Sequence, residues 1–208
     1  YLPEVAQTLD SVTHAPIAVI ALGYRRDAID HPLDGFGLLC CSDSPAAQGQ
    51  PVLGVLFSST AFKNRAPEGR VLLEVMVGGT RAPEAVISSD EELVERARSA
   101  IAGMLGEGTP PDFVEITRWS PVLPQYTLGH AKRTALLRDT VAAYGGVRLA
   151  GNYLEGVGVE AAAASGARAA EELLVESERV TRLAGAAVPS QLETERGLSG
   201  SDRLSEDD

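Results

Sequence analysis

The stretch "GNYLEGVGVEAAAASGARAAEEL", residues 151–173, decides the fold, because Gly156, Gly158 and Ala161 spell G-x-G-x-x-A. A dinucleotide-binding fingerprint requires its first glycine directly after a strand, and an acidic residue at the end of a second strand about 20 residues later. Here residues 152–155 separate the predicted strand from the first glycine, and only a polar segment follows the helix. The context argues against a self-contained NAD-binding unit.

What the stretch predicts instead is a strand at 147–151, a glycine loop and a helix of small residues that begins at Val159. The first turn of a helix has free backbone N–H groups and the positive end of the helix dipole, which favour an electron-rich or anionic group. An ordinary glycine-rich turn between a strand and a helix is the alternative on these residues alone. Beyond Leu174 few large apolar residues occur, so we expect an acidic disordered tail over 175–208.

Upstream of this unit, the first part of the chain predicts a largely antiparallel sheet, because apolar runs alternate with clusters of Pro, Asp and Gly. These runs are 15–24, 35–42, 52–59 and 71–79. The apolar run 53–57 indicates that part of the sheet is covered on both faces. With the helices described next, the fold class is a mixed α+β or α/β fold.

Two helices and one more strand are expected after the sheet. A capping-box spacing of serine and glutamate at 88–92 begins a helix of about 90–105, which Gly106 ends. Residues 112–120 alternate as a strand, and Pro121 and Pro124 are expected to prevent regular pairing after it. A second helix covers about 131–144.

Composition excludes several classes of function. The 208 residues carry a net charge of −11, which disfavours binding to nucleic acid. No long apolar run or secretory signal occurs, which predicts the cytoplasm, with peripheral membrane contact left open. Three scattered histidines and two adjacent cysteines predict no metal site. No Ser-His-Asp, Cys-His or paired-carboxylate pattern designates a catalytic residue.

Four segments, in the same order, resemble the FAD-dependent protoporphyrinogen and coproporphyrinogen oxidases of haem biosynthesis. They are "GFGLL" (35–39), "LGVLFSSTAFKNRAPEGRVLLEVMVGG" (53–79), "RWSPVLPQYTLGH" (118–130) and "LAGNYLEGVGVEAAAASGARAA" (149–170). The resemblance implies a sheet-based substrate-binding domain in residues 1–112. It also implies that residues 113–174 are the carboxy-terminal part of a Rossmann-like FAD-binding domain, and that the chain resembles the carboxy-terminal fragment of a longer enzyme.

The resemblance also implies positions for the ligands. The residues that match the family's FAD-binding positions are Trp119, Gly151, Asn152, Val157, Gly158 and Val159. Of these, 157–159 would present their backbone to the flavin and ribityl end. For the substrate, the matching residues are Leu39, Leu56 and Met76, which would clamp a flat tetrapyrrole by shape and desolvation. For each of these three side chains, plain core packing is the alternative.

The implied reaction is a six-electron oxidation of a porphyrinogen to the porphyrin in three two-electron rounds, with oxygen as the acceptor. Whether the substrate is coproporphyrinogen III or protoporphyrinogen IX stays open. Two alternatives remain: another flavin amine-oxidase relative that acts on amines or polyenes, and a non-catalytic remnant that binds tetrapyrroles. Because no G-x-G-x-x-G strand-helix unit is present, we expect this chain alone to bind FAD weakly or not at all.

Overall fold

The computed structural model of the 208-residue chain describes residues 3–41 and 51–186. The chain divides into two compact units, Tyr1–His130 and Ala131–Asp208, and each is described here by itself. The sequence placed the corresponding boundary earlier, between residues 112 and 113. Whether the two parts bind substrate and FAD, as the resemblance implies, stays a prediction.

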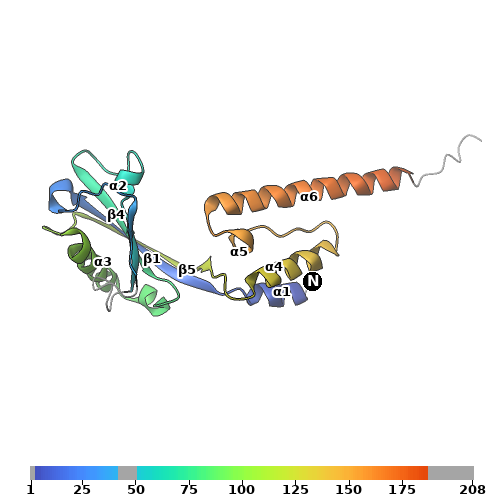
Figure 1. The fold of residues 1–208 in the computed structure, drawn as a ribbon, viewed down its shortest axis with the longest axis horizontal. Coiled ribbons are helices and arrows are strands. Elements are labelled where there is room, and N and C mark those ends of the chain that lie inside the picture. Colours follow the sequence, from blue (N-terminus) through green and yellow to red (C-terminus); the bar gives the residue numbers. More distant parts are fainter. Residues whose placement is uncertain (1–2, 42–50, 187–208) are drawn as a thin grey trace, which may run out of the picture. The chain divides into compact units, whose positions relative to one another are not determined.

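The elements follow one another along the chain as Figure 1 shows. Unit 1 contains α1 (Pro3–Asp10), β1 (His14–Arg25), η1 (Arg26–Ala28), β2 (Gly37–Leu39), β3 (Val52–Leu56), α2 (Ser58–Ala61), β4 (Arg70–Gly78), η3 (Pro83–Ile87), α3 (Asp90–Leu105) and β5 (Phe113–Pro124). The helices that follow are α4 (His130–Ala142), α5 (Asn152–Glu155) and α6 (Val159–Ala186).

The strands form one five-stranded sheet in the order β2-β3-β4-β1-β5, and every neighbouring pair is antiparallel. The predicted antiparallel sheet and the mixed α+β class are therefore confirmed. Two strands are shorter than predicted: β2 covers only Gly37–Leu39, and β3 ends at Leu56 because the chain turns into α2 at Ser58.

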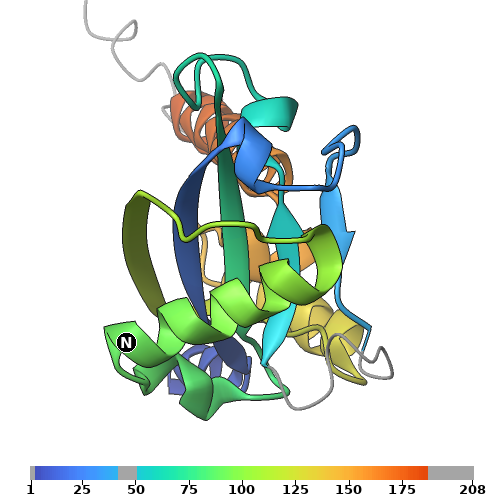
Figure 2. The same ribbon diagram turned by 90° about the vertical axis from the view of Figure 1, so that its left-hand side faces the viewer.

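Alternate residues of the central strands lie on opposite faces of the sheet. On β1 and β4 one set is buried, at 6% exposure or less: Ala18, Ile20, Leu22, Tyr24, Val71, Leu73, Val75 and Val77. These side chains form one core with Leu93, Ala97 and Ile101 of α3. Figure 2 shows α3, in green, crossing this face of the sheet. We call it the covered face, and the opposite side the open face.

The ends of α3 confirm the predicted capping signals. The Ser89 hydroxyl accepts a hydrogen bond from the Glu92 amide at 3.2 Å, which satisfies one free N–H of the first turn. Gly106 ends the helix with φ 71°, a left-handed conformation that glycine adopts at little cost. A Cβ there would also lie 2.5 Å from the Asp30 carboxylate, so the position requires glycine.

The path of β5 corrects the prediction for the prolines at 121 and 124. The strand continues through Pro124 and pairs with β1 as far as His14, with a register shift between Ala15 and Ile17. Proline cannot donate to the ladder, but β5 lies at the edge of the sheet, where only one side of the strand needs partners. This pairing also makes residues 113–124 part of unit 1.

Unit 2 departs from the sequence predictions at two places. Residues 147–151 form no strand, because no segment within 3–41 and 51–186 pairs with them. The helix α6 continues past Leu174 to Ala186, so the prediction of a disordered tail is wrong for residues 175–186. Ion pairs of Arg148 with Glu172 and Glu176, both at 3.0 Å, stabilise this continuation. The predicted tail at 187–208 lies outside the described residues.

Over the described part of the chain, no helix is both long enough and apolar enough to cross a lipid bilayer.

Candidate functional site

The open face of the sheet brings together the side chains that the sequence assigned to the substrate. Leu39 pairs with Gly54, and Gly54 pairs with Met76, so these residues form one row across β2, β3 and β4. Directly paired residues of an antiparallel sheet point to the same side. Leu39 and Met76 therefore both lie on the open face, and 87% of Leu39 is exposed.

Leu56 and Trp119 share this face. Leu56 follows Gly54 by two positions and pairs with Glu74, which precedes Met76 by two. Trp119 pairs with Ile17, two positions before Val19, and Val19 in turn pairs with Met76. The strand period of two thus places all three substrate candidates and one cofactor candidate on one surface. Half of the Trp119 side chain is exposed, at 51%.

Small residues let the strands approach closely under this surface. A Cβ on Gly54 would lie 2.5 Å from the backbone oxygen of Leu38 and 3.4 Å from the Leu39 side chain. Gly54 is buried and has the Leu39 side chain against it, so a larger residue does not fit at this position. A flat apolar ligand on this face would contact the exposed Leu39 and the half-buried Met76.

A pocket of about 650 Å³ continues the open face over β1, β4 and β5. Its floor includes Val19, Ala21 and Gly23, and its walls include Leu72 and Phe113. The charged residues that line it are Arg65, Arg70, Glu74, Asp112 and Glu115. The sequence had not assigned a role to any of these charged residues. Alternation along 70–78 is the signal that could have placed Glu74 beside Met76 on the ligand side.

The helix α2 and the loop after it are fastened to the edge of this pocket. The fully buried Ser58 hydroxyl donates a hydrogen bond to Glu74 at 2.6 Å, and the Ser59 hydroxyl accepts one from the Leu72 amide at 3.1 Å. The two serines of the "SSTAFKNRAP" segment therefore hold residues 65–67 against the pocket.

In unit 2, the glycine loop contains the other cofactor candidates. Gly151 has φ 145°, and a Cβ there would lie 2.7 Å from the Tyr153 ring, so the loop requires glycine at this position. Its amide donates to Ser165 of α6 at 3.2 Å, which ties the loop to the helix. Asn152 is the first residue of the short helix α5.

The start of α6 fits a flat, electron-rich ligand. A Cβ on Gly158 would meet no atom within 4 Å, and the flanking Val157 and Val159 are 52% and 89% exposed. The amides of the first helical turn have no partner inside a helix. Open space, two exposed apolar side chains and the amides of the first helical turn therefore lie together at the start of α6. Trp119 belongs to unit 1.

Ion pairs fix the helices of unit 2 around this loop. Glu155 of α5 accepts from Arg138 of α4 and from Arg168 of α6, both at 2.6 Å. The hydrogen bond from Arg138 holds the pKa of Glu155 below its ordinary value. These charges are structural contacts and leave the start of α6 unobstructed.

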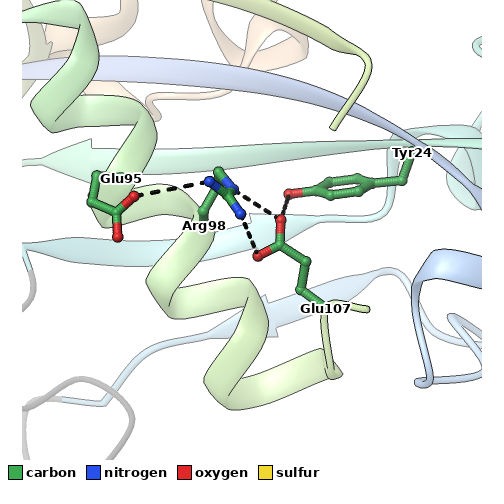
Figure 3. Close-up of polar contacts among 4 residues, drawn as sticks. All are labelled: Tyr24, Glu95, Arg98 and Glu107. Carbon is green, nitrogen blue, oxygen red and sulfur yellow. Dashed lines mark hydrogen bonds and ion pairs between the residues drawn. The ribbon is translucent and has the colours of Figure 1, made fainter. Parts of the chain in front are cut away.

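A second polar cluster lies on the covered face. The Tyr24 hydroxyl donates to Glu107 at 3.1 Å, and Arg98 of α3 donates to the same carboxylate at 3.0 Å (Figure 3). Burial, and then the charge of Glu107, raise the pKa of Tyr24 well above its ordinary value. Because Tyr24 is fully buried, this cluster stabilises the packing of α3 on β1.

Within 3–41 and 51–186, no three His, Cys, Asp or Glu side chains gather in a way that could hold a metal ion.

Comparison with known families connects this geometry to chemistry. The sequence model of the family described as "Flavin containing amine oxidoreductase" matches residues 2–174. The match ends within α6, so the last turns of that helix lie beyond it.

Two curated relatives carry the names of porphyrinogen oxidases. The chain is 32% identical over 174 residues to the coproporphyrinogen III oxidase of Propionibacterium freudenreichii. This alignment covers 83% of this chain and 32% of that protein. It is 34% identical over 164 residues to the chloroplastic protoporphyrinogen oxidase 1 of Arabidopsis thaliana. This alignment covers 74% of this chain and 30% of that protein. The chain therefore spans about a third of the length of these relatives.

A solved structure shares the fold. A provisionally named protoporphyrinogen oxidase from Exiguobacterium sp. 255-15 superposes with a TM-score of 0.66 at 27% identity, over 86% of this chain and 37% of that one.

Proposed function

Because the chain belongs to the flavin containing amine oxidoreductases, a family of FAD-dependent oxidoreductases, we propose that it supplies part of the active site of a porphyrinogen oxidase. The substrate is coproporphyrinogen III or protoporphyrinogen IX, the product is the porphyrin of haem biosynthesis, and oxygen is the electron acceptor. The names of the two curated relatives support a porphyrinogen as the substrate, rather than an amine or a polyene.

The observation that carries the proposal is the row of apolar side chains on the open face. Leu39, Leu56 and Met76 stand on three adjacent strands around the buried Gly54. A porphyrinogen offers a large apolar surface and few polar groups beyond its peripheral carboxylates, so desolvation must supply most of its binding free energy. Leu39 is almost fully exposed, and Leu56 and Met76 are half-buried, so none of the three belongs to the buried core.

The glycine loop of unit 2 would hold the flavin end of FAD. In this proposal the backbone of Val157, Gly158 and Val159 meets the flavin and ribityl groups, while Gly151 and Asn152 approach the pyrophosphate. FAD supplies the acceptor for hydride equivalents from the substrate. The chain's own residues bind and orient the macrocycle and exclude water from it, which is how protein groups assist a cofactor reaction.

The test is a chimera in which this chain replaces the matching segment of the P. freudenreichii enzyme. We expect the chimera to retain FAD and to convert coproporphyrinogen III into fluorescent coproporphyrin III in air. Replacing Gly158 with Trp should abolish flavin retention, because the indole would fill the open space at the start of α6.

The control replaces Gly166, a helical glycine of α6 whose Cβ would also meet no neighbour within 4 Å, with Ala. This variant should keep its flavin. A folded chimera that holds FAD but oxidises an amine or a polyene, and no porphyrinogen, would overturn the proposal.

A further inference from the structure

Three of the five charged residues that line the pocket on the open face have partners within unit 1. Arg70 forms an ion pair with Asp112. Glu74 accepts the hydrogen bond of the buried Ser58 hydroxyl at 2.6 Å. Glu115 stands exposed on the edge strand β5, in the row in which Glu74 and Ala21 also lie.

Arg65 is different from these residues. Its guanidinium lies 5.8 Å from the centre of the Phe62 ring, and Phe62 contacts Phe36 edge to face at 6.3 Å. Among the described residues, no carboxylate lies within ion-pair distance of Arg65, although it lines the same pocket as three of them. A cation held over an aromatic ring keeps a defined position while its N–H groups stay free.

We propose that Arg65 binds a peripheral carboxylate of a tetrapyrrole whose ring lies on the open face, and so favours substrates rich in carboxylates. This inference rests on the proposed function and assigns a specificity residue within it. Arginine suits the role because its planar fork of N–H donors matches both oxygens of a carboxylate.

The register of the sheet supports the placement. Leu56 pairs with Glu74, and Met76 pairs with Val19, and both Glu74 and Val19 line the pocket. A ring that lies on Leu56 and Met76 therefore has one edge at the pocket. Because Glu74 and Glu115 repel an anion from the floor, a carboxylate at this edge is favoured only beside Arg65.

The experiment uses the 208-residue chain and two probes, coproporphyrin III and its tetramethyl ester. The chain has a single tryptophan, Trp119, on the open face, so its quenching reports binding there. The anisotropy of porphyrin fluorescence gives a second, independent readout. The variants are Arg65→Gln, Arg65→Lys and, as the matched control, Lys63→Gln, which removes the same charge from an exposed residue that does not line the pocket.

We expect Arg65→Gln to weaken coproporphyrin III binding about tenfold, and Arg65→Lys to weaken it less, because lysine keeps the charge without the fork. Lys63→Gln should leave the affinity within about twofold, and the ester should bind all variants equally. Circular dichroism verifies that each variant is folded.

Equal binding of coproporphyrin III by the wild-type chain and Arg65→Gln would overturn the inference and leave the proposed function intact. If Arg65→Gln weakens binding of the ester as much as binding of coproporphyrin III, Arg65 has a packing role. If Lys63→Gln weakens binding of coproporphyrin III as much as Arg65→Gln does, the attraction is unspecific. Both results contradict the inference. If the wild-type chain binds neither probe, the inference is wrong, and the chimera described above then tests the proposed function by itself.

Discussion

The two faces of the sheet are built from the same strands and have opposite composition. On β4, Val71, Leu73, Val75 and Val77 are buried at 6% exposure or less, whereas the residues between them are half-buried and include a glutamate. On β1 the open face has Ala21 and Gly23 where the covered face has Leu22 and Tyr24. At this end of β1, the covered face therefore has large side chains that fill space, and the open face has small ones.

Because of this difference, residues on the covered face of a strand stabilise the fold, whereas residues on the open face of the same strand are available for binding. Burial of apolar surface under α3 supplies the free energy of folding of unit 1. The open face, with an exposed Leu39 and a pocket of about 650 Å³, contributes little to folding and is free to bind a ligand. Each substitution below tests one side of this division.

The largest effect is expected from Leu73→Ala, which removes a fully buried side chain from the covered face. Such a cavity costs about 2–5 kcal/mol of the free energy of unfolding. The control Leu72→Ala alters the adjacent, half-buried residue of the open face and should cost less than about half as much. Urea denaturation followed by Trp119 fluorescence measures both. Equal losses would show that the two faces do not differ in this way.

On the open face, Met76→Ala should weaken coproporphyrin III binding about tenfold, because a large apolar contact with the ring is lost. The free energy of unfolding should change by less than about 1 kcal/mol. Porphyrin anisotropy titration and urea denaturation separate the two quantities. A large loss of stability with unchanged affinity would assign Met76 to the core instead.

A smaller effect is expected from Tyr24→Phe, which removes the buried hydroxyl that donates to Glu107 (Figure 3). The lost hydrogen bond should cost about 1 kcal/mol of the free energy of unfolding, since Arg98 still pairs with Glu107. No change in porphyrin affinity should accompany it. A changed affinity would connect the covered face to the ligand.

The same variant should alter the response to alkaline pH. Folding raises the pKa of Tyr24 above its ordinary value, so its contribution to stability is complete below pH about 10, the unfolded value. That contribution is lost as pH rises from there toward the folded pKa. Between pH 9 and pH 11, the free energy of unfolding of the wild-type chain should therefore fall more than that of Tyr24→Phe. If the two free energies fall in parallel with pH, the role assigned to Tyr24 is wrong.

The smallest effect is expected from Glu115→Gln, an exposed residue on the edge strand that lines the pocket. Stability should stay within about 0.5 kcal/mol. Coproporphyrin III should bind about twofold more tightly, because one negative charge no longer repels its carboxylates. Tighter binding of the uncharged ester as well would show that the effect is not electrostatic.

Local signals predicted the elements that depend on neighbouring residues. Ser89 and Glu92 predicted the start of α3, and apolar runs between clusters of Pro, Asp and Gly predicted β1 and β4, because these signals act within a few residues. The continuation of β5 through Pro124 was missed, since proline is tolerated there only by an edge strand. The continuation of α6 was missed because Arg148, outside the helix, stabilises its charged turns.

The candidate site was predicted only in part. Resemblance to the family supplied Leu39, Leu56 and Met76, and the register places them on one face. Arg65 was not identified, because nothing in its neighbouring sequence distinguishes a free arginine from a paired one. Which arginine has a carboxylate partner depends on contacts between segments far apart in the chain, as Arg70 and Asp112 show.

The sequence by itself determined the antiparallel sheet, the capped helix, the glycine loop and the family, because each is written in local patterns of residues. Only the tertiary structure decided the order β2-β3-β4-β1-β5, the face that α3 covers and the charges that remain free in the pocket. The physical reason is that the period of a strand fixes which residues share a face of the sheet. Which alternate set is buried depends on what the rest of the chain packs against it.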